Sequence, residues 1–519
     1  MTSSPTPAES VGQGIALSSA RGRWVLACAV LASGIAMLDG TVVNVALPTI
    51  GRDLDASLST LQWVVSAYML TLSALLLLGG ALGDRLGRRR TLLVGVVWFA
   101  VASMLCGIAQ DGGTLIAARA LQGVGGALLT PGSLALVRAT FRPDDQAKAV
   151  GAWSGLTGVA GAVGPFLGGW LIDGPGWRWI FLINVPLAAV VVAIAISHVP
   201  ESRDVSAAGH RFDFLGACLG AAFLAGISYA LITAAGASAL AVAVPALLGL
   251  AAGVAFVLVE RRAAAPMLPL GLLRSRLFGV TNVMTLCLYA AIGGILFLLP
   301  VQLQNGLGYD ALEAGVATLP ITLLMLLLSA RAGALAQRVG PTLPLAVGPV
   351  VAAAGVLLMW RIGPGASYAT DVLPAVAVLG LGMSTFVAPL TATVLASVES
   401  ERAGLASGVN NTAARIAQLL VVAALPLAVG LSDDAYRDPG AVDTAFHRAS
   451  AVCAGLFLLA ALAAALFVRP RVFDRSEGEA PACAPQCRTH VALSAPPLEP
   501  GTGSAEGAGG GSTKAAGDG

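Results

Sequence analysis

The amino-acid sequence predicts an all-α polytopic membrane protein. Its 519 residues are 56% hydrophobic, with a mean hydropathy of +0.82, and only 11% are charged, against about 25% in ordinary soluble domains. Apolar stretches long enough to cross a bilayer, each of about 18 residues or more, recur along most of the chain. Basic residues gather in every second connection between these stretches.

Fourteen apolar stretches follow one another and are expected to be transmembrane helices. They cover residues 24–48, 61–82, 91–110, 113–137, 149–172, 178–198, 214–235, 238–259, 278–304, 313–336, 342–362, 371–397, 403–430 and 446–468. The first twenty residues lack the pattern of a removable signal peptide, so we expect the first helix to direct insertion. Because the number of helices is even, both termini are expected on one side.

The distribution of arginine predicts which side that is. One set of connections contains Arg21, Arg23, Arg85, Arg88, Arg89, Arg90, Arg138, Arg142, Lys148, Arg203, Arg211, Arg261, Arg262, Arg274, Arg276, Arg331, Arg338, Arg402, Arg469 and Arg471. The other set contains only Arg52, Arg178, Arg361, Arg437 and Arg448. Short basic connections stay in the cytoplasm, so both termini are predicted there. The preference for Arg, Ala and Gly over Lys indicates a G+C-rich bacterial genome, and therefore a bacterial cytoplasmic membrane.

An internal repeat organises the helices. The octet Gly80–Gly87, GALGDRLG, closes the second helix, and the octet Gly333–Gly340, GALAQRVG, closes the tenth. Weaker matches pair the fourth helix with the twelfth and the fifth with the thirteenth, at the same offset of eight helices. Helices one to six thus repeat as nine to fourteen, as in transporters built from parallel repeats. The predicted division is 1–23 (cytoplasmic segment), 24–198 (six-helix bundle), 199–277 (two inserted helices with flanking loops), 278–468 (six-helix bundle) and 469–519 (tail).

The tail is rich in Pro, Gly, Ala and Ser and is expected to be disordered. Transport should therefore survive removal of residues 476–519. The spacing of Cys483, Cys487 and His490 does not match a zinc framework, so no metal site is predicted. An enzyme is the least expected class, because the helices contain neither a His/Glu metal pair nor an activated serine.

The connection after the second helix, GDRLGRRR, is a candidate gating loop. Asp84 is expected to bond to the start of the next helix or to Arg88, and Gly83 and Gly87 permit a tight turn. The alternative is that its arginines only hold the loop in the cytoplasm. The loop resembles the signature of the major facilitator superfamily, which matches Gly80, Asp84, Arg85, Gly87, Arg88 and Arg89. The second copy carries Gln337 where Asp84 stands, so the latch is expected to be asymmetric.

The fifth helix carries a row of glycines that leaves one face almost without side chains. Close packing of small residues explains any one pair of them. Together they resemble the antiporter motif of the superfamily, on Gly158, Gly161, Gly164, Pro165, Gly168 and Gly169. With LDGTVVNVALPTI in the first helix and QWVVSAYML in the second, residues 24–468 resemble the fourteen-helix drug/proton antiporters. The resemblance implies the major facilitator fold and export driven by the proton gradient, without a cofactor.

Asp39 stands inside the first apolar helix and requires an explanation. It lies roughly 22 Å from the cytoplasmic face, and Arg119 of the fourth helix lies roughly 9 Å below the outer face. Their similar depth predicts an ion pair. Burial favours the neutral acid and Arg119 favours the carboxylate, so rocking can load and release a proton at Asp39. The alternative is a permanent bond to Arg119 or Asn44 that only locks the helices.

The substrate is less well specified by the sequence. Candidate cavity residues, each of which could instead make an interhelical bond, are Gln62, Tyr68, Asn282, Tyr289, Gln302, Asn410, Asn411 and Arg415. Because Glu313 and Asp371 lie near helix ends, few deep carboxylates remain, which favours neutral or weakly charged amphipathic drugs or antibiotics. Expected partners are this substrate, protons and the lipid bilayer, without nucleic acid, and a monomer is expected. The alternatives are a lipid or amphiphile flippase and a non-transporting membrane receptor of the same fold.

Overall fold

The computed structural model of the protein describes residues 14–203, 213–234, 236–263, 268, 271–272, 275–399 and 402–469. Within these ranges fourteen helices are long and apolar enough to cross a membrane, which confirms the predicted all-helical fold class and its number of spans. The predicted tail, with Cys483, Cys487 and His490, lies outside the described residues apart from Arg469, as do Arg211, Arg274 and Arg471.

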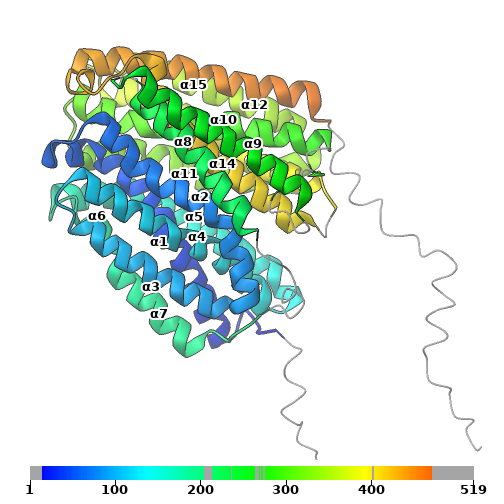
Figure 1. Ribbon diagram of the computed structural model, residues 1–519. Coiled ribbons are helices and arrows are strands. Elements are labelled where there is room, and N and C mark those ends of the chain that lie inside the picture. The colour runs from blue at the N-terminus through cyan, green and yellow to red at the C-terminus, as the bar shows by residue number, and fades with distance from the viewer. Residues whose placement is uncertain are drawn as a thin grey trace, which may run out of the picture. The chain divides into compact units, whose positions relative to one another are not determined.

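The helices fall into three groups along the chain (Figure 1). The N-terminal set is α1 (Ala20–Asp53), α2 (Leu58–Leu86), α3 (Arg88–Gly107), α4 (Gly112–Thr140), α5 (Pro143–Asp173), α6 (Trp179–Leu182) and α7 (Asn184–His198). The inserted pair is α8 (Phe214–Thr233) and α9 (Ala239–Arg262). The C-terminal set is α10 (Arg276–Val301), η4 (Gln302–Gly306), α11 (Ala311–Val339), α12 (Thr342–Leu358), η5 (Met359–Arg361), η6 (Tyr368–Val372), α13 (Leu373–Ala396), α14 (Ala403–Val429), η8 (Ala435–Arg437) and α15 (Pro439–Phe467).

Many helices extend several residues beyond the apolar stretches that predicted them. Polar caps set these ends: Ser57 accepts a hydrogen bond from the backbone of Thr60, and Asp111 exchanges hydrogen bonds with Thr114 at the start of α4. At the ends of α2 and α11, the repeat-related Gly87 and Gly340 have φ angles of +110° and +83°, a conformation that favours glycine.

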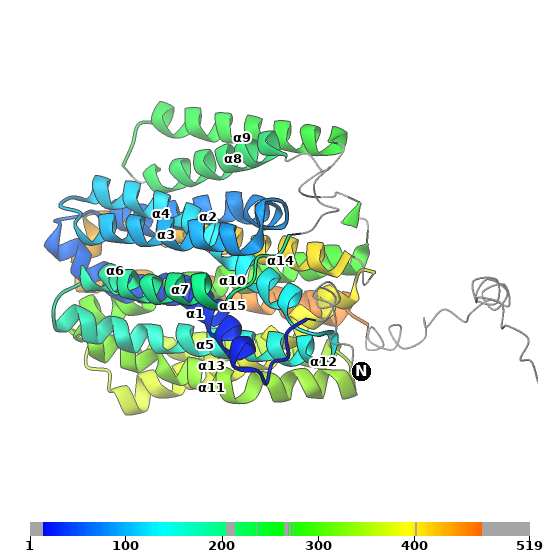
Figure 2. The same cartoon turned by 90° about the horizontal axis from the view of Figure 1, so that it is seen from below.

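Each set packs mainly within itself, and a few helix pairs join the two sets. Helix α5 contacts α11, and α2 contacts α14, whereas the inserted pair packs α8 on α9. Helix α8 also touches α2 and α14, one helix from each set. Figure 2 shows α8 and α9 as a separate pair along one edge of the bundle. We call the end of the bundle where α1, α3 and α5 begin the arginine-rich end, and the other the opposite end.

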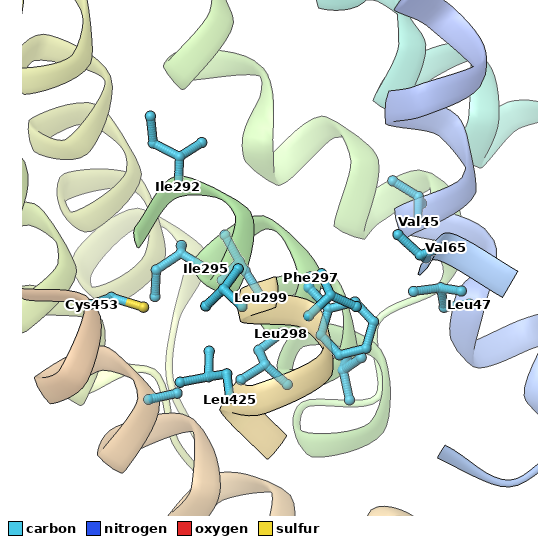
Figure 3. Close-up of a cluster of buried hydrophobic side chains, with 14 of the residues drawn as sticks. Val45, Leu47, Val65, Ile292, Ile295, Phe297, Leu298, Leu299, Leu425 and Cys453 are labelled. Atoms are coloured by element: carbon cyan, nitrogen blue, oxygen red, sulfur yellow. The ribbon is translucent and has the colours of Figure 1, made fainter. Parts of the chain in front are cut away.

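Apolar side chains seal the two sets together at the opposite end (Figure 3). Val45 and Leu47 of α1 belong to one buried cluster with Phe297 and Leu298 of α10 and Leu425 of α14. Each of these five side chains is buried. Close packing of this kind holds transmembrane helices together by van der Waals contact. The core between the two sets therefore lies at the opposite end.

Toward the arginine-rich end one side of α5 loses its contact with α11. Gly151, Gly158, Pro165 and Gly169 recur at intervals of seven, seven and four residues, so they share one side of α5. Near the opposite end this side meets α11, because a Cβ atom at Gly169 would lie 2.5 Å from the carbonyl oxygen of Ala311. At Gly151 and Gly158 a Cβ atom would meet no heavy atom within 4 Å. This side of α5 is thus covered by α11 at one end and uncovered at the other.

Candidate functional site

Asp39 is the centre of a buried polar network in the N-terminal set. Its side chain is fully buried, and its carboxylate accepts a hydrogen bond of 2.6 Å from Nη1 of Arg119. Gln122 donates to the same carboxylate at 2.8 Å and Asn184 at 3.3 Å. The structure thus brings together the acid and the base that the sequence places at similar depth. The alternative partner Asn44 lies instead 3.5 Å from the carbonyl oxygen of Gly40, to which it donates.

Arg119 is held from several sides. Its Nε donates to the carbonyl oxygen of Val64 at 3.2 Å, and its Nη1 also donates to the side chain of Gln122. The guanidinium carbon lies 4.2 Å from the centre of the Tyr68 ring and 5.7 Å from that of Phe181, which adds cation–π attraction. A buried ion pair is tolerated only when its remaining donors and acceptors are satisfied in this way.

Sequence reasoning missed three members of this network. Gln122, Asn184 and Ser103 were not predicted, yet both amides donate to the Ser103 hydroxyl, at 3.1 and 2.9 Å. Gln122 could have been found, because it follows Arg119 by three residues and therefore shares its helix face. Asn184 and Ser103 carry no signal of this kind. The site is thus built from α1, α3, α4 and the start of α7, with α2 supplying the contacts of Val64 and Tyr68 to Arg119.

The candidate gating loop forms the predicted pair between Asp84 and Arg88, with Nε and Nη2 of Arg88 donating to one carboxylate oxygen at 3.0 and 2.8 Å. Gly80 packs against Pro131 of α4, and Arg85 lies in the last turn of α2. The segment after α7 closes over the loop, a contact that was not predicted. Glu201 accepts from the backbone N–H of Arg89 at 3.2 Å and lies 3.7 Å from the guanidinium of Arg90.

The glycine-rich motif on α5 divides into two parts. Gly164 and Gly168 press on α1, where Cβ atoms would lie 2.0 Å from the Thr41 hydroxyl and 2.9 Å from Val42. Close to them, the carbonyl oxygen of Pro165 would lie 2.2 Å from a Cβ at Gly315 of α11. A Cβ atom at Gly161 would contact only Met37, at 3.3 Å, and a Cβ atom at Gly158 would contact no heavy atom within 4 Å. The motif therefore packs two neighbours tightly at one end and is open at the other.

Two aspartates join the sets at the opposite end by a related arrangement. Asp173, the last residue of α5, accepts from the backbone N–H groups of Ala311 and Leu312 at 3.3 and 2.7 Å, in the first turn of α11. Asp433, which follows α14, accepts from the backbone N–H of Ser59 at 2.8 Å, in the first turn of α2. Since α5 corresponds to α14 and α2 to α11 in the repeat, these two end latches are equivalent.

The other candidate cavity residues have different surroundings. Gln62 donates to the carbonyl oxygen of Val422 at 2.7 Å, and Gln302 donates to Ile362 and Asp443 at 3.0 and 2.8 Å, so both make interhelical bonds near the opposite end. A second group lies on α10 and α14. It comprises Asn282, which donates to Phe278; Asn410, which accepts from Thr285 at 2.7 Å; partly buried Tyr289 and Arg415; and exposed Asn411.

Arg415 is notable within this group. Its Nε has no hydrogen-bond acceptor among the residues that the structure describes, and it forms no ion pair with any of them. The described residues also contain no cluster of three or more His, Cys, Asp or Glu side chains arranged to hold a metal ion. The second group therefore presents amides, a phenol and a cation.

Comparisons with known proteins agree on one family. A sequence profile described as Major Facilitator Superfamily matches residues 29–422. The puromycin resistance protein pur8 of Streptomyces alboniger is 36% identical over 462 residues, 86% of this chain and 92% of that protein. The multidrug efflux pump LfrA of Mycolicibacterium smegmatis is 34% identical over 440 residues, 83% of each chain.

A third relative and two solved structures complete the comparison. The tetracenomycin C resistance and export protein of Streptomyces glaucescens is 37% identical over 424 residues, 79% of this chain and 76% of that protein. A D-xylose–proton symporter has a TM-score of 0.61 at 14% identity, covering 86% of this chain and 98% of that one. An inward-facing bacterial homologue of a human lysosomal transporter, Spinster, has a TM-score of 0.60 at 16% identity, covering 88% and 98%. At these identities the two structures share the fold.

Proposed function

The chain belongs to the Major Facilitator Superfamily and is a multi-pass bacterial membrane transporter of its drug-efflux type, and on that premise we propose that it exports hydrophobic or amphipathic antibiotics in exchange for protons. Asp39 carries the proton in this proposal, and Arg119 sets how readily the proton leaves. The arginine-rich end faces the cytoplasm, as do both termini. The protein works as a monomer.

The observation that carries the proposal is the fully buried ion pair of Asp39 and Arg119. Binding a proton removes the negative charge of Asp39 and therefore its attraction to Arg119. The two amides of Gln122 and Asn184 can still bond a neutral acid, so the network survives in either state with a different distribution of charge. Losing that attraction gives a physical means by which proton binding shifts the packing of α1 against α4.

Rocking of the two sets supplies the transport step. In the proposed orientation the uncovered side of α5 opens to the cytoplasm, where an amphipathic compound enters from the inner leaflet or the solvent. Export then requires that the two end latches break and that α11 closes over Gly158. The loop around Asp84 and Arg88 lies at the end that closes, where its pairing can change between the two states.

The chemistry of the second polar group supports a neutral or weakly charged substrate. Asn282, Tyr289, Asn410, Asn411 and Arg415 supply hydrogen bonds but no carboxylate to attract a dication. Puromycin is the first compound to test, since a relative is named for resistance to it. A lipid flippase would use the same fold, and movement of fluorescent lipid without movement of puromycin would favour that function instead.

Transport in proteoliposomes tests the proposal. An imposed proton gradient should make the wild-type protein accumulate puromycin while protons move in the other direction. Asp39→Asn preserves size but cannot exchange a proton, so both fluxes should fall to the background of empty liposomes. Asp53→Asn is the matched control, because Asp53 is at the end of the same helix, exposed and outside the network. If Asp39→Asn still concentrates puromycin under the gradient, the ion pair is a structural lock and not the carrier.

A further inference from the structure

A cavity of about 750 Å³ lies between the inserted pair and the two helix sets. Its walls come from α8 and α9, from Ser73 and Ala74 of α2, and from the stretch of α14 between Val409 and Ile416. It is separate from the network around Asp39, none of whose residues lines it. The volume is typical of a site for a small organic ligand, for which cavities of about 300–1,000 Å³ are common.

The cavity has the depth of one membrane leaflet. Along α9 its lining runs from Leu250 to Arg261, a stretch whose eleven steps span about 16 Å of helix. This is about half of the ~30 Å hydrocarbon thickness of a bilayer. Because Arg261 is in the last turn of α9, the cavity begins at the arginine-rich end and stops near the middle of the membrane. Figure 2 shows the inserted pair at the edge of the bundle.

The lining is apolar except at defined points. Phe223, Leu224, Val254 and Phe256 are among the apolar side chains that line it on the side of α8 and α9. The hydroxyls of Ser73 and Thr412 have no hydrogen-bond partner within the described part of the chain, and Ser73 is only 4% exposed.

Arg261 supplies the charge of this cavity. The side chain lines the cavity at its arginine-rich end, is exposed, and forms no ion pair with a residue that the structure describes. A guanidinium at the membrane surface binds phosphate well, and basic pockets between transmembrane helices recognise anionic lipid head groups. An apolar channel one leaflet deep with a cation at its mouth matches a molecule with a long apolar tail and an anionic head.

We propose that this cavity binds an anionic phospholipid of the adjacent leaflet, with an acyl chain between α8, α9, α2 and α14 and the phosphate on Arg261. The lipid would touch both sets, because α2 belongs to one and α14 to the other. It would therefore be held most tightly in the conformation described here and would be released when the sets rock. The inserted pair then has a role of its own, as the outer wall of a lipid site. This inference does not depend on the exported compound or on proton coupling.

Photolabelling of the full-length protein in nanodiscs tests the site. The probe is phosphatidylglycerol with a diazirine in its acyl chain, compared with phosphatidylcholine that carries the same chain. Phosphatidylglycerol should label peptides containing Phe223, Phe256 or Ala413 at least severalfold more than phosphatidylcholine. Arg261→Gln should lower this labelling about fivefold, the equivalent of about 1 kcal/mol for one arginine beside an anionic lipid. Arg262→Gln, the same change one residue on and outside the cavity lining, should leave it unchanged.

A filled cavity provides the second variant. A Cβ at Gly220 would lie 3.8 Å from the Phe256 ring, an ordinary contact, so Gly220→Leu should fold and exclude both lipids from these peptides. The comparison of the two lipid head groups uses only the wild-type protein. It therefore remains a valid test even if Arg261→Gln or Gly220→Leu misfolds. Equal labelling by the two lipids, or labelling indifferent to Arg261→Gln, would overturn the proposal. Labelling of the same residues by a photoreactive puromycin that phosphatidylglycerol does not displace would assign the cavity to the transport substrate instead.

Discussion

Asp39 is tolerated in the membrane because three side-chain donors from two other helices converge on it. Arg119 neutralises its charge, and Gln122 and Asn184 occupy its other oxygen. Each group depends on the others, since an unpaired charge at this depth would be costly. A change in the charge of any one of these groups therefore alters the balance of the whole network.

Removing the cation should reveal this dependence. Arg119→Ala leaves Asp39 buried without a counter-charge, so we expect a loss of about 3–5 kcal/mol in stability together with loss of transport. Adding Asp39→Asn removes the uncompensated charge, so the double variant should unfold at a higher temperature than Arg119→Ala alone. Thermal unfolding of the purified proteins in detergent measures both effects. Strictly additive losses would show that the two side chains do not interact.

Glycine is required at the turn of the gating loop for two reasons. Gly87 has a φ of +110°, and a Cβ there would lie 2.5 Å from a carboxylate oxygen of Glu201. Gly87→Ala should therefore lower stability by about 1–2 kcal/mol from backbone strain alone. Gly83→Ala is the matched control, because that residue is helical and its Cβ would be 4.0 Å from Thr91. Equal melting temperatures for the two variants would contradict this explanation.

Along α5 the same kind of residue has two different uses. Near the opposite end its glycines let α1 and α11 approach to backbone contact, whereas near the arginine-rich end they leave the helix uncovered. The tightly packed glycines join α5 to α1 in its own set and to α11 in the other set. The uncovered glycines have a role only if α11 comes closer in another conformation, so larger side chains should have different effects at the packed and at the uncovered positions.

Leucine substitutions separate these two uses. Gly164→Leu collides with Thr41 of α1, so we expect a protein that still inserts but has a lowered melting temperature and no transport. Gly158→Leu meets nothing in the present conformation, so its melting temperature should be that of the wild type. Its transport should nevertheless fall severalfold, because the side chain obstructs closure by α11. Efflux assays and thermal unfolding of both variants test these expectations. Normal efflux by Gly164→Leu would show that the motif serves only ordinary helix packing.

The two end latches should bias the conformation. Asp173 and Asp433 each place a carboxylate on the positive end of a helix from the other set, an interaction of up to about 1 kcal/mol at an exposed position. Val45 is buried in the closed end. Replacing both aspartates by Asn should raise the labelling of Val45→Cys by an impermeant maleimide about fivefold or more, because opening of this end would expose that position. Asp434→Asn is the control, since that neighbouring residue is not among those bonded to α2. Unchanged labelling would mean that the apolar seal alone holds the end shut.

At the scale of the whole molecule, closure at one end and separation at the other define a single conformation. The apolar cluster around Val45 and Phe297 and the two latches lie together at the opposite end. The uncovered glycines of α5 and the gating loop lie at the arginine-rich end. In the proposed orientation, with the arginine-rich end in the cytoplasm, the closed end lies outside and the uncovered side of α5 faces the cytoplasm.

That orientation can be tested on the complete chain. Reporter fusions to the C-terminus should give a cytoplasmic signal, because basic connections remain inside. Fusions in the turn after α5, near Gly176, should give an external signal. An external signal at the C-terminus, or a pattern of twelve spans, would refute the topology and with it the proposed direction of transport.

The sequence alone determined the spans, the repeat and the depth of the Asp39–Arg119 pair. Hydropathy, periodicity and residue counts are properties of the linear sequence. In a helix, the position of a residue in the sequence directly gives its position along the helix axis and the face on which it lies. The same signals predicted the turn at Gly87 and the pair of Asp84 with Arg88, which are four residues apart. Such contacts are local, so they can be predicted from one segment of the sequence without knowing which helices pack against it.

The tertiary structure alone decided which distant residues meet. Asn184 reaches Asp39 across 145 residues, and Asp433 reaches Ser59 across 374. Neither contact can be predicted from the spacing of residues along the sequence. The closed end, the clamp of Glu201 on the gating loop and the cavity behind α8 and α9 are likewise properties of surfaces from different helices. They depend on how the helix sets pack in one conformation, and a sequence that must serve two conformations cannot specify only one of them.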